Sequence, residues 1–231
     1  MTQNLTPLID AFPRLRVVVL GDAMLDRRLD GRCGRVCPEA PVPVVALAGQ
    51  RDAPGGAANA AANAAALGAD VCLLAAVGDD AEAAALRAAV ERAGVAADLQ
   101  TCRGRRTLAK TRVAADGHLL VRYDQGDTRP LPAGCERALI GRLRSLFPTG
   151  DAVLVSDYGY GVLTPAVVGT LTALRAKHPH VAVVADSKRL GLLRDLAPTA
   201  VKPNYAQALH LLGEADSAGG PDRAARIAER A

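Results

Sequence analysis

Three polar residues in this sequence follow short apolar runs of the kind that form buried strands. Asp157, Asp186 and Asn204 each come within three residues of the end of such a run. In an open α/β sheet, ligands bind at the edge formed by the carboxyl ends of the parallel strands. We therefore predict that these three side chains line a ligand site, because such a row exceeds what helix capping needs.

Two further carboxylates, Asp22 and Asp26, follow the apolar run 16–20. At the same edge of a sheet, a carboxylate accepts hydrogen bonds from sugar hydroxyls. The alternative is structural, with Asp22 capping a turn and Asp26 exposed on the surface. We favour ligand binding for Asp26 and leave both interpretations open for Asp22.

The stretch 54–68 joins a glycine pair, Gly55-Gly56, to an alanine-rich run that contains Asn59 and Asn63. Alanine favours a helix, and glycines at its start let backbone N–H groups approach an anion. The two asparagines are four residues apart and share one helix face. The stretch alone is equally consistent with an alanine-rich packing helix whose asparagines are solvated.

Residues 107–124 predict a hairpin around the dipeptide Asp116-Gly117. The proline-punctuated segment 38–47 predicts an edge strand or a flap, because proline lacks the N–H that a central strand requires. We expect the two segments to form a small β lid beside the main domain.

Basic residues on the hairpin are candidates for binding a phosphate over the start of the 54–68 helix. The guanidinium group suits a phosphate because it forms paired hydrogen bonds, and the alternative is a solvated basic strand. The candidates are Lys110, Arg112 and Arg122, whereas Arg103, Arg105 and Arg106 are assigned to solvent.

Apolar runs alternate with helix-length segments along most of the chain, which predicts an α/β fold with a parallel-rich sheet and helices on both of its faces. Predicted strands cover 16–20, 71–77, 152–157, 181–185 and the short run 200–201, and predicted helices cover 81–93, 136–147, 164–177 and 221–231.

Composition excludes several classes of function. The chain has 231 residues, a net charge of +4, no Trp and only 3% aromatic residues, which argues against nucleic-acid binding. We expect no signal peptide, and no apolar segment is long enough to span a membrane. The five cysteines show no C-x-x-C or zinc-binding spacing, so we expect reduced thiols, a cytoplasmic location and no protein-bound metal.

Taken together, these segments resemble the ribokinase-like (PfkB) sugar kinases, and within them the heptose-7-phosphate kinase branch. The resemblance extends from Arg16 to about Gly213. Its motifs are G-D-A-M-L-D at 21–26, C-P-E-A-P-V-P-V-V at 37–45, P-G-G-A-A-N at 54–59, L-G-A-D at 67–70, K-T-R-V at 110–113, V-R-Y-D at 121–124, S-D-Y-G-Y-G at 156–161 and K-P-N at 202–204.

The resemblance implies a Rossmann-like α/β domain with a β lid, which transfers the γ-phosphate of ATP to a sugar hydroxyl with Mg²⁺. The implied substrate is D-glycero-β-D-manno-heptose 7-phosphate, converted to the 1,7-bisphosphate for lipopolysaccharide precursors, and the implied partner is a second copy bound through the lid. The implied substrate-binding residues are Asp26, Gly55, Gly56, Asn59, Lys110, Arg112, Arg122 and Asp157, and the nucleotide-binding residues are Asp186, Lys188, Lys202, Asn204 and Gln207.

Two departures from the family pattern are visible. The acid of the family motif N-x-x-E is replaced by Gln207, which we expect to weaken the hold on Mg²⁺. The G-A-G-D motif with the family's catalytic base does not occur, so we expect residues 1–231 to be an incomplete kinase domain and assign no catalytic residue. The alternatives are a catalytically silent protein that binds a sugar phosphate, and a kinase for another sugar or a nucleoside.

Overall fold

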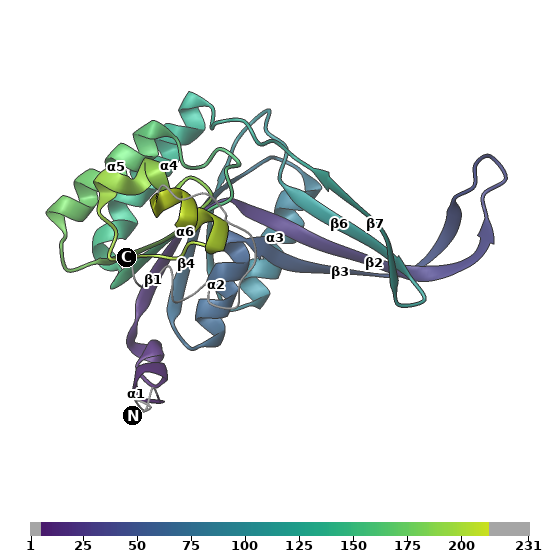
Figure 1. The fold of residues 1–231 in the computed structure, drawn as a ribbon, viewed down its shortest axis with the longest axis horizontal. Helices are drawn as coiled ribbons and strands as arrows, with labels where there is room; N and C mark the ends of the chain where they lie inside the picture. The colour runs from purple at the N-terminus through teal and green to yellow at the C-terminus, as the bar shows by residue number, and fades with distance from the viewer. Residues whose placement is uncertain (1–5, 213–231) are drawn as a thin grey trace.

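Two β-sheets define the architecture of the protein in the computed structural model, which describes residues 6–212 (Figure 1). The first sheet has six strands in the order β10-β9-β8-β1-β4-β5, and every pair is parallel. The strands are β1 (Arg16–Gly21), β4 (Asp70–Val77), β5 (Ala96–Thr101), β8 (Ala152–Asp157), β9 (Ala182–Ser187) and β10 (Ala200–Val201).

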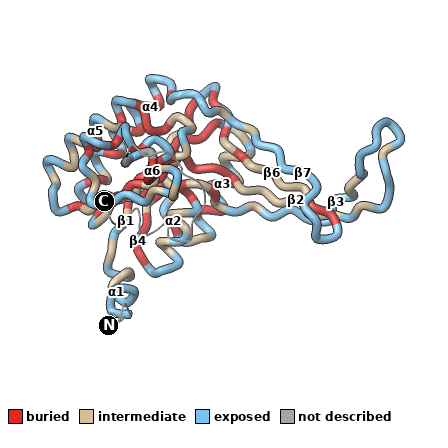
Figure 2. Tube along the Cα trace, viewed as in Figure 1, coloured by how far each residue is buried: buried red, intermediate tan, exposed pale blue. Residues whose placement is uncertain are grey.

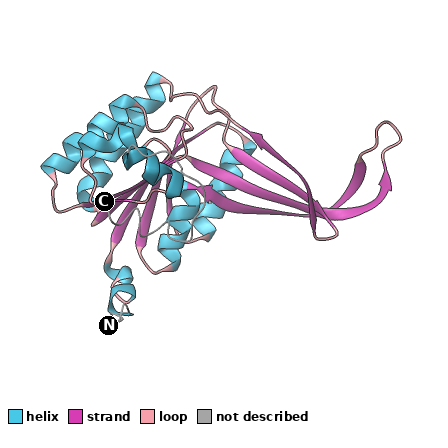
Figure 3. Cartoon of the chain, viewed as in Figure 1, coloured by secondary structure: helices cyan, strands magenta, loops and turns pink. Residues whose placement is uncertain are grey.

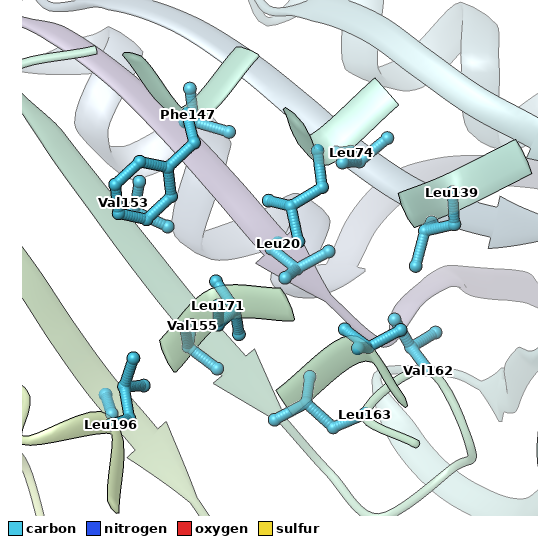
Figure 4. Packing of buried hydrophobic residues seen from close by; sticks show 14 of the residues in the cluster. Leu20, Leu74, Leu139, Phe147, Val153, Val155, Val162, Leu163, Leu171 and Leu196 are labelled. Atoms are coloured by element: carbon cyan, nitrogen blue, oxygen red, sulfur yellow. The ribbon is translucent and has the colours of Figure 1, made fainter. Parts of the chain in front are cut away.

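Helices cover both faces of this sheet because its central strands are apolar on both sides. In β1, Val19 belongs to one core cluster while its neighbours Val18 and Leu20 belong to the other. On one side the core includes α2 (Ala57–Ala66) and α3 (Ala81–Arg92), and on the other α4 (Ala133–Leu146) and α5 (Pro165–Lys177). Figure 4 shows the second cluster, where Leu20 and Val155 of the sheet pack near Leu171 of α5.

The second sheet forms an arm that extends away from the first (Figures 1 and 3). We call this arm the lid. Its strand order is β3-β2-β6-β7, with β2 and β6 parallel and the outer pairs antiparallel. The strands are β2 (Ala23–Val36), β3 (Pro43–Gly56), β6 (Ala109–Ala115) and β7 (His118–Gln125).

The predicted hairpin is confirmed, since β6 and β7 join at Asp116 and Gly117 with φ of 49° and 84°. Both residues adopt the left-handed conformation that a tight hairpin turn requires. The segment 38–47 enters edge strand β3, as predicted, but that strand extends to Gly56. Consequently Gly55 and Gly56 lie in the strand, and the helix predicted from residue 54 begins at Ala57.

The lid is buried at its root and, on β6, again at Ala114 and Ala115 near the hairpin turn (Figure 2). Ala23, Met24 and Leu25 at the start of β2 are buried, residues 26–30 are half-buried, and most of the strand beyond Gly31 is exposed. The root therefore anchors the arm, while β7 and most of the outer parts of β2 and β3 are exposed to solvent.

The remaining described elements are short helices and 3₁₀ turns, and α6 follows the last strand, β10. Thr164 caps α5 as predicted, its hydroxyl accepting a hydrogen bond from the N–H of Val167 at 3.2 Å. Among the described helices, none is both long and apolar enough to cross a membrane. The elements are α1 (Thr6–Ile9), α6 (Tyr205–Leu212) and the 3₁₀ turns Phe12–Arg14, Phe147–Thr149 and Leu190–Leu196; the helix predicted at 221–231 lies outside the described residues.

The expectation of five reduced thiols is wrong for one pair. A disulfide joins Cys102, directly after β5, to Cys135 in the first turn of α4, with Cα atoms 5.5 Å apart. The two cysteines are 33 residues apart in sequence, so only the fold brings them together. Cys33, Cys37 and Cys72 are free.

Candidate active site

Asp26 lies on β2 against the glycine pair at the end of β3. A Cβ atom on Gly55 would lie 2.6 Å from Oδ2 of Asp26, so only glycine leaves room for this carboxylate. Gly56 has φ of 58°, a left-handed conformation in which the chain turns from β3 into α2. The glycine pair therefore places the Asp26 carboxylate close to the start of α2, on which Asn59 is exposed.

The lid brings the predicted cations to the same surface as Asp26. Asp26 pairs across the sheet with Lys110, and Arg112 pairs with Arg122. Directly opposed residues share a face of the sheet, as do residues two apart on one strand. All four side chains therefore lie on one face, and Nη1 of Arg112 donates to Oδ1 of Asp26 at 2.9 Å.

Two tyrosines from the loop after β8 connect the lid to the main sheet. Nζ of Lys110 lies 5.9 Å from the ring centroid of Tyr158 and 5.5 Å from that of Tyr160. Nζ of Lys188, after β9, lies 5.6 Å from the Tyr160 ring. Cation–π attraction therefore links a predicted substrate-side lysine to a predicted nucleotide-side lysine. The tyrosines were not among the predicted site residues, although both lie in the S-D-Y-G-Y-G motif.

Asp22 fixes the backbone of the tyrosine loop. Its fully buried carboxylate accepts hydrogen bonds from the N–H groups of Tyr158 at 2.8 Å, Tyr160 at 3.0 Å and Val162 at 3.2 Å. Burial raises the pKa of Asp22, and these backbone donors partly offset that rise. The question left open by the sequence is answered in favour of a structural role.

Arg105 also binds this loop, so its assignment to solvent is wrong. Its side chain is buried and donates to the carbonyl oxygens of Tyr160 at 2.7 Å, Arg129 at 2.8 Å and Asp127 at 3.0 Å. Burial lowers the pKa of Arg105. The three carbonyl groups converge only in the folded chain, so no local sequence signal marks this residue. Arg103 and Arg106 are exposed, as predicted.

Asp157 is almost fully buried and connects the ends of β8 and β9. Its carboxylate accepts hydrogen bonds from the Ser187 hydroxyl at 2.6 Å, the Gly159 N–H at 3.0 Å and the Arg189 guanidinium at 3.2 Å. Its side chain is 1% exposed. Direct contact with a substrate stays a prediction, and it requires one of these partners to move.

Three of the predicted nucleotide-binding residues, Lys188, Asn204 and Gln207, line a cavity at the ends of β9 and β10. The cavity has a volume of about 890 Å³ and combines the cations Lys188, Arg189 and Arg194 with the apolar Leu190 and Leu211. This size and lining fit a nucleotide, since cations suit phosphates and leucines suit a base.

Four of the predicted nucleotide-binding residues, Asn204, Gln207, Lys202 and Asp186, bind one another in pairs. Asn204 and Gln207 form a reciprocal cap at the start of α6, each side-chain oxygen accepting from the other residue's N–H, at 2.9 and 2.8 Å. Lys202 forms an ion pair with Asp186 at 3.0 Å. Within residues 6–212, no group of three or more His, Cys, Asp or Glu side chains is arranged to bind a metal.

Comparisons with known proteins extend these observations. The model of the pfkB family of carbohydrate kinases matches residues 14–230. The chain is 40% identical to the bifunctional protein HldE of Caulobacter vibrioides over 98% of its own length and 47% of that protein. It is also 40% identical to HldE of Azorhizobium caulinodans, over 93% of the chain and 45% of that protein. The chain thus spans about half the length of the curated relatives it matches.

Solved structures share the fold at lower identity. Phosphofructokinase-2 from Escherichia coli in complex with substrates and products aligns with a TM-score of 0.72 and 18% identity, over 93% of this chain and 68% of that one. Ribokinase from Cryptococcus neoformans in complex with ADP aligns with a TM-score of 0.60 and 21% identity, over 93% and 66%. The predicted ribokinase-like α/β fold is confirmed, and the family match over residues 14–230 shows that the chain belongs to the pfkB family of carbohydrate kinases.

Proposed function

We propose that this chain binds D-glycero-β-D-manno-heptose 7-phosphate and belongs to a kinase that converts it with ATP to the 1,7-bisphosphate, in the cytoplasm. The observation that supports this proposal is the lid face, where a sugar-binding carboxylate, Asp26, lies among Lys110, Arg112 and Arg122. An uncharged sugar needs no such cations, whereas a phosphate forms charge-assisted hydrogen bonds with them.

In this proposal, different residues bind different parts of the substrate. Asp26 and Asn59 bind sugar hydroxyls, and the glycine pair leaves space for the ring beside Asp26. Arg112 exchanges the Asp26 carboxylate for the phosphate of the sugar, while Lys110, oriented by the two tyrosines, adds a second positive charge. This arrangement orients the sugar before any phosphate is transferred.

The nucleotide occupies the cavity beside Lys188 and Arg189 in this proposal. ATP supplies the phosphoryl group, and Mg²⁺ neutralises charge on its phosphates. Lys188 and Arg189 bind phosphate oxygens, and Asn204 positions α6 next to them through its cap. Because the Lys188 side chain contacts the same tyrosine as Lys110, Tyr160 connects the nucleotide side to the sugar side in this proposal.

A second candidate function is sugar-phosphate binding without efficient transfer. It is favoured by the carboxylates near the site, each of which already has a partner: Asp26 has Arg112, Asp157 has Ser187 and Asp186 has Lys202. A general base typically contributes about 10²–10⁴-fold to the rate. Slow phosphoryl transfer together with tight binding of the sugar phosphate would support this candidate.

Calorimetric titration tests the first proposal. We expect the heptose 7-phosphate to bind at least about tenfold more tightly than unphosphorylated heptose, because charged hydrogen bonds to the phosphate are lost in the latter. Equal affinities would contradict a sugar phosphate, and tighter binding of a nucleoside would favour the alternative substrate class. Release of ADP in the presence of both substrates measures transfer separately.

A homodimer formed through the lid belongs to the same proposal. Large apolar side chains are exposed on the outer part of the lid, among them Val36, Leu47, Leu119 and Val121. Burying such a surface against a second copy is favourable, since exposed apolar patches mark interaction sites. Sedimentation analysis of the wild type and of Val121→Asp should show a dimer that the charge dissociates, and a wild-type monomer would contradict this proposal.

A further inference from the structure

Four arginines form a single row across the lid, one from each strand. Arg51 of β3 is opposite Arg28 of β2, Arg28 is opposite Arg112 of β6, and Arg112 is opposite Arg122 of β7. Directly opposed residues lie on the same face of a sheet. With about 4.8 Å between neighbouring strands, the row extends about 14 Å.

The row lies on the same face as the candidate sugar site. Arg28 is two residues beyond Asp26 on β2, and Arg112 is two residues beyond Lys110 on β6. Two residues along a strand correspond to about 7 Å. A sugar bound at Asp26 would therefore reach the row with a phosphate on its far carbon.

Charge on the row is unbalanced at its β2–β3 end. Arg28 and Arg51 share one carboxylate, that of Asp30, at 2.8 and 2.9 Å. Their side chains are 42% and 75% exposed, so an anion can approach them. The other two arginines each have an aspartate of their own, Arg112 with Asp26 and Arg122 with Asp124.

Like charges directly opposite each other destabilise a sheet unless an anion lies between them. Asp30 supplies one negative charge to two guanidinium groups, which leaves one positive charge uncompensated next to Arg112. A phosphate carries between one and two negative charges at neutral pH and has oxygens for several guanidinium groups.

We propose that Arg28 and Arg51 bind a phosphate together with Arg112, so that the arginine row recognises the phosphate of the substrate. In the absence of substrate, Asp30 takes the place of this anion. The identity of the substrate as a sugar phosphate rests on the proposed function, whereas binding of a phosphate by the row does not.

The test compares two double variants with equal loss of charge. Arg28→Ala/Arg51→Ala removes half of the row, and Arg32→Ala/Arg35→Ala removes two exposed arginines from β2 beyond the row. The affinity for inorganic phosphate is measured by ³¹P NMR at low ionic strength. We expect about tenfold weaker binding for the first variant and less than about threefold for the second.

The variant Asp30→Asn should change the affinity for phosphate in the opposite direction. If Asp30 competes with phosphate for the two arginines, its neutralisation should tighten binding of inorganic phosphate several-fold. A role for Asp30 in folding alone would not produce tighter binding. Equal losses in the two double variants, or no gain with Asp30→Asn, would overturn the proposal.

The same variants distinguish this proposal from the proposed function. If inorganic phosphate binds at the row but the heptose 7-phosphate binds no more tightly than inorganic phosphate, the sugar assignment fails and the row remains. If the heptose 7-phosphate binds equally well to both double variants, the row is not its phosphate site, whatever the sugar specificity.

Discussion

Arg112 and Asp26 form an ion pair across two strands of the lid, with Nη1 and Oδ1 2.9 Å apart and side chains that are 36% and 34% exposed. A pair this exposed contributes only about 0–1 kcal/mol to stability. It is therefore readily exchanged for a ligand that offers a phosphate to the arginine and hydroxyl groups to the carboxylate. The pair orients both side chains before the ligand arrives.

Replacing Arg112 should weaken binding of the phosphate but not of the sugar. Arg112→Ala removes a phosphate partner and frees Asp26, so the heptose 7-phosphate should bind about tenfold more weakly while unphosphorylated heptose binds unchanged or more tightly. Calorimetric titration of both ligands measures this difference. Arg103→Ala, an exposed arginine outside the lid strands, is the control. Equal weakening for both ligands would show that Arg112 does not bind the phosphate.

Replacing Arg105 should destabilise the protein. Arg105→Met leaves three carbonyl oxygens without their donor beneath the tyrosine loop, and we expect a loss of about 3 kcal/mol in the free energy of unfolding. Urea denaturation measures it, with Arg103→Met expected to change stability by less than about 0.5 kcal/mol. An unchanged midpoint would show that the buried guanidinium is dispensable.

The sequence predicted the central strands because β1, β4 and β8 are continuous apolar runs that only a doubly covered sheet can bury. It did not predict β2 or β5. Strand β2 follows β1 after a single residue and consists largely of charged residues beyond Leu25, because both of its faces reach solvent. The sequence of β5, AADLQT, contains no β-branched residue before its last position.

The residues of the candidate site were likewise predicted only in part. Asp26, Lys110 and Arg112 were predicted from local patterns, and the structure places them on one face of the lid. Asp22 and Arg105 act through backbone groups that are 136 to 140 and 22 to 55 residues away in sequence. No local pattern encodes such partners. The row of four arginines likewise depends on strand register, which the unpredicted β2 determines.

The Cys102–Cys135 disulfide can be tested by counting thiols. Under denaturing, non-reducing conditions, three of the five cysteines should react with a thiol reagent, and all five after reduction. A disulfide that closes a loop of this length stabilises the folded state by about 3–4 kcal/mol in the chain-entropy account. Reduction should therefore lower the unfolding midpoint. The control is Cys72→Ser, which removes a free thiol but keeps the disulfide. Five reactive thiols without reductant would contradict the disulfide.

Acid should weaken the lid through Asp52. This carboxylate accepts two hydrogen bonds from Arg27, at 2.8 and 3.0 Å, and these bonds hold its pKa below the ordinary value. Because the folded-state pKa is lowered, the stabilisation is present above the unfolded pKa of about 3.9 and is lost as the pH falls through the folded pKa. Asp52→Asn removes the ion pair at every pH.

The difference in stability between wild type and Asp52→Asn should therefore be largest at neutral pH and should shrink below about pH 4. Urea denaturation at a series of pH values measures it. Asp79→Asn, an exposed acid outside the lid, should show no such convergence with the wild type. A constant difference between wild type and Asp52→Asn from pH 7 to pH 3 would mean that the ionised carboxylate does not stabilise the lid. The asparagine would then act by altered packing at the root, where Arg27 also approaches Glu82 of α3 at 3.8 Å.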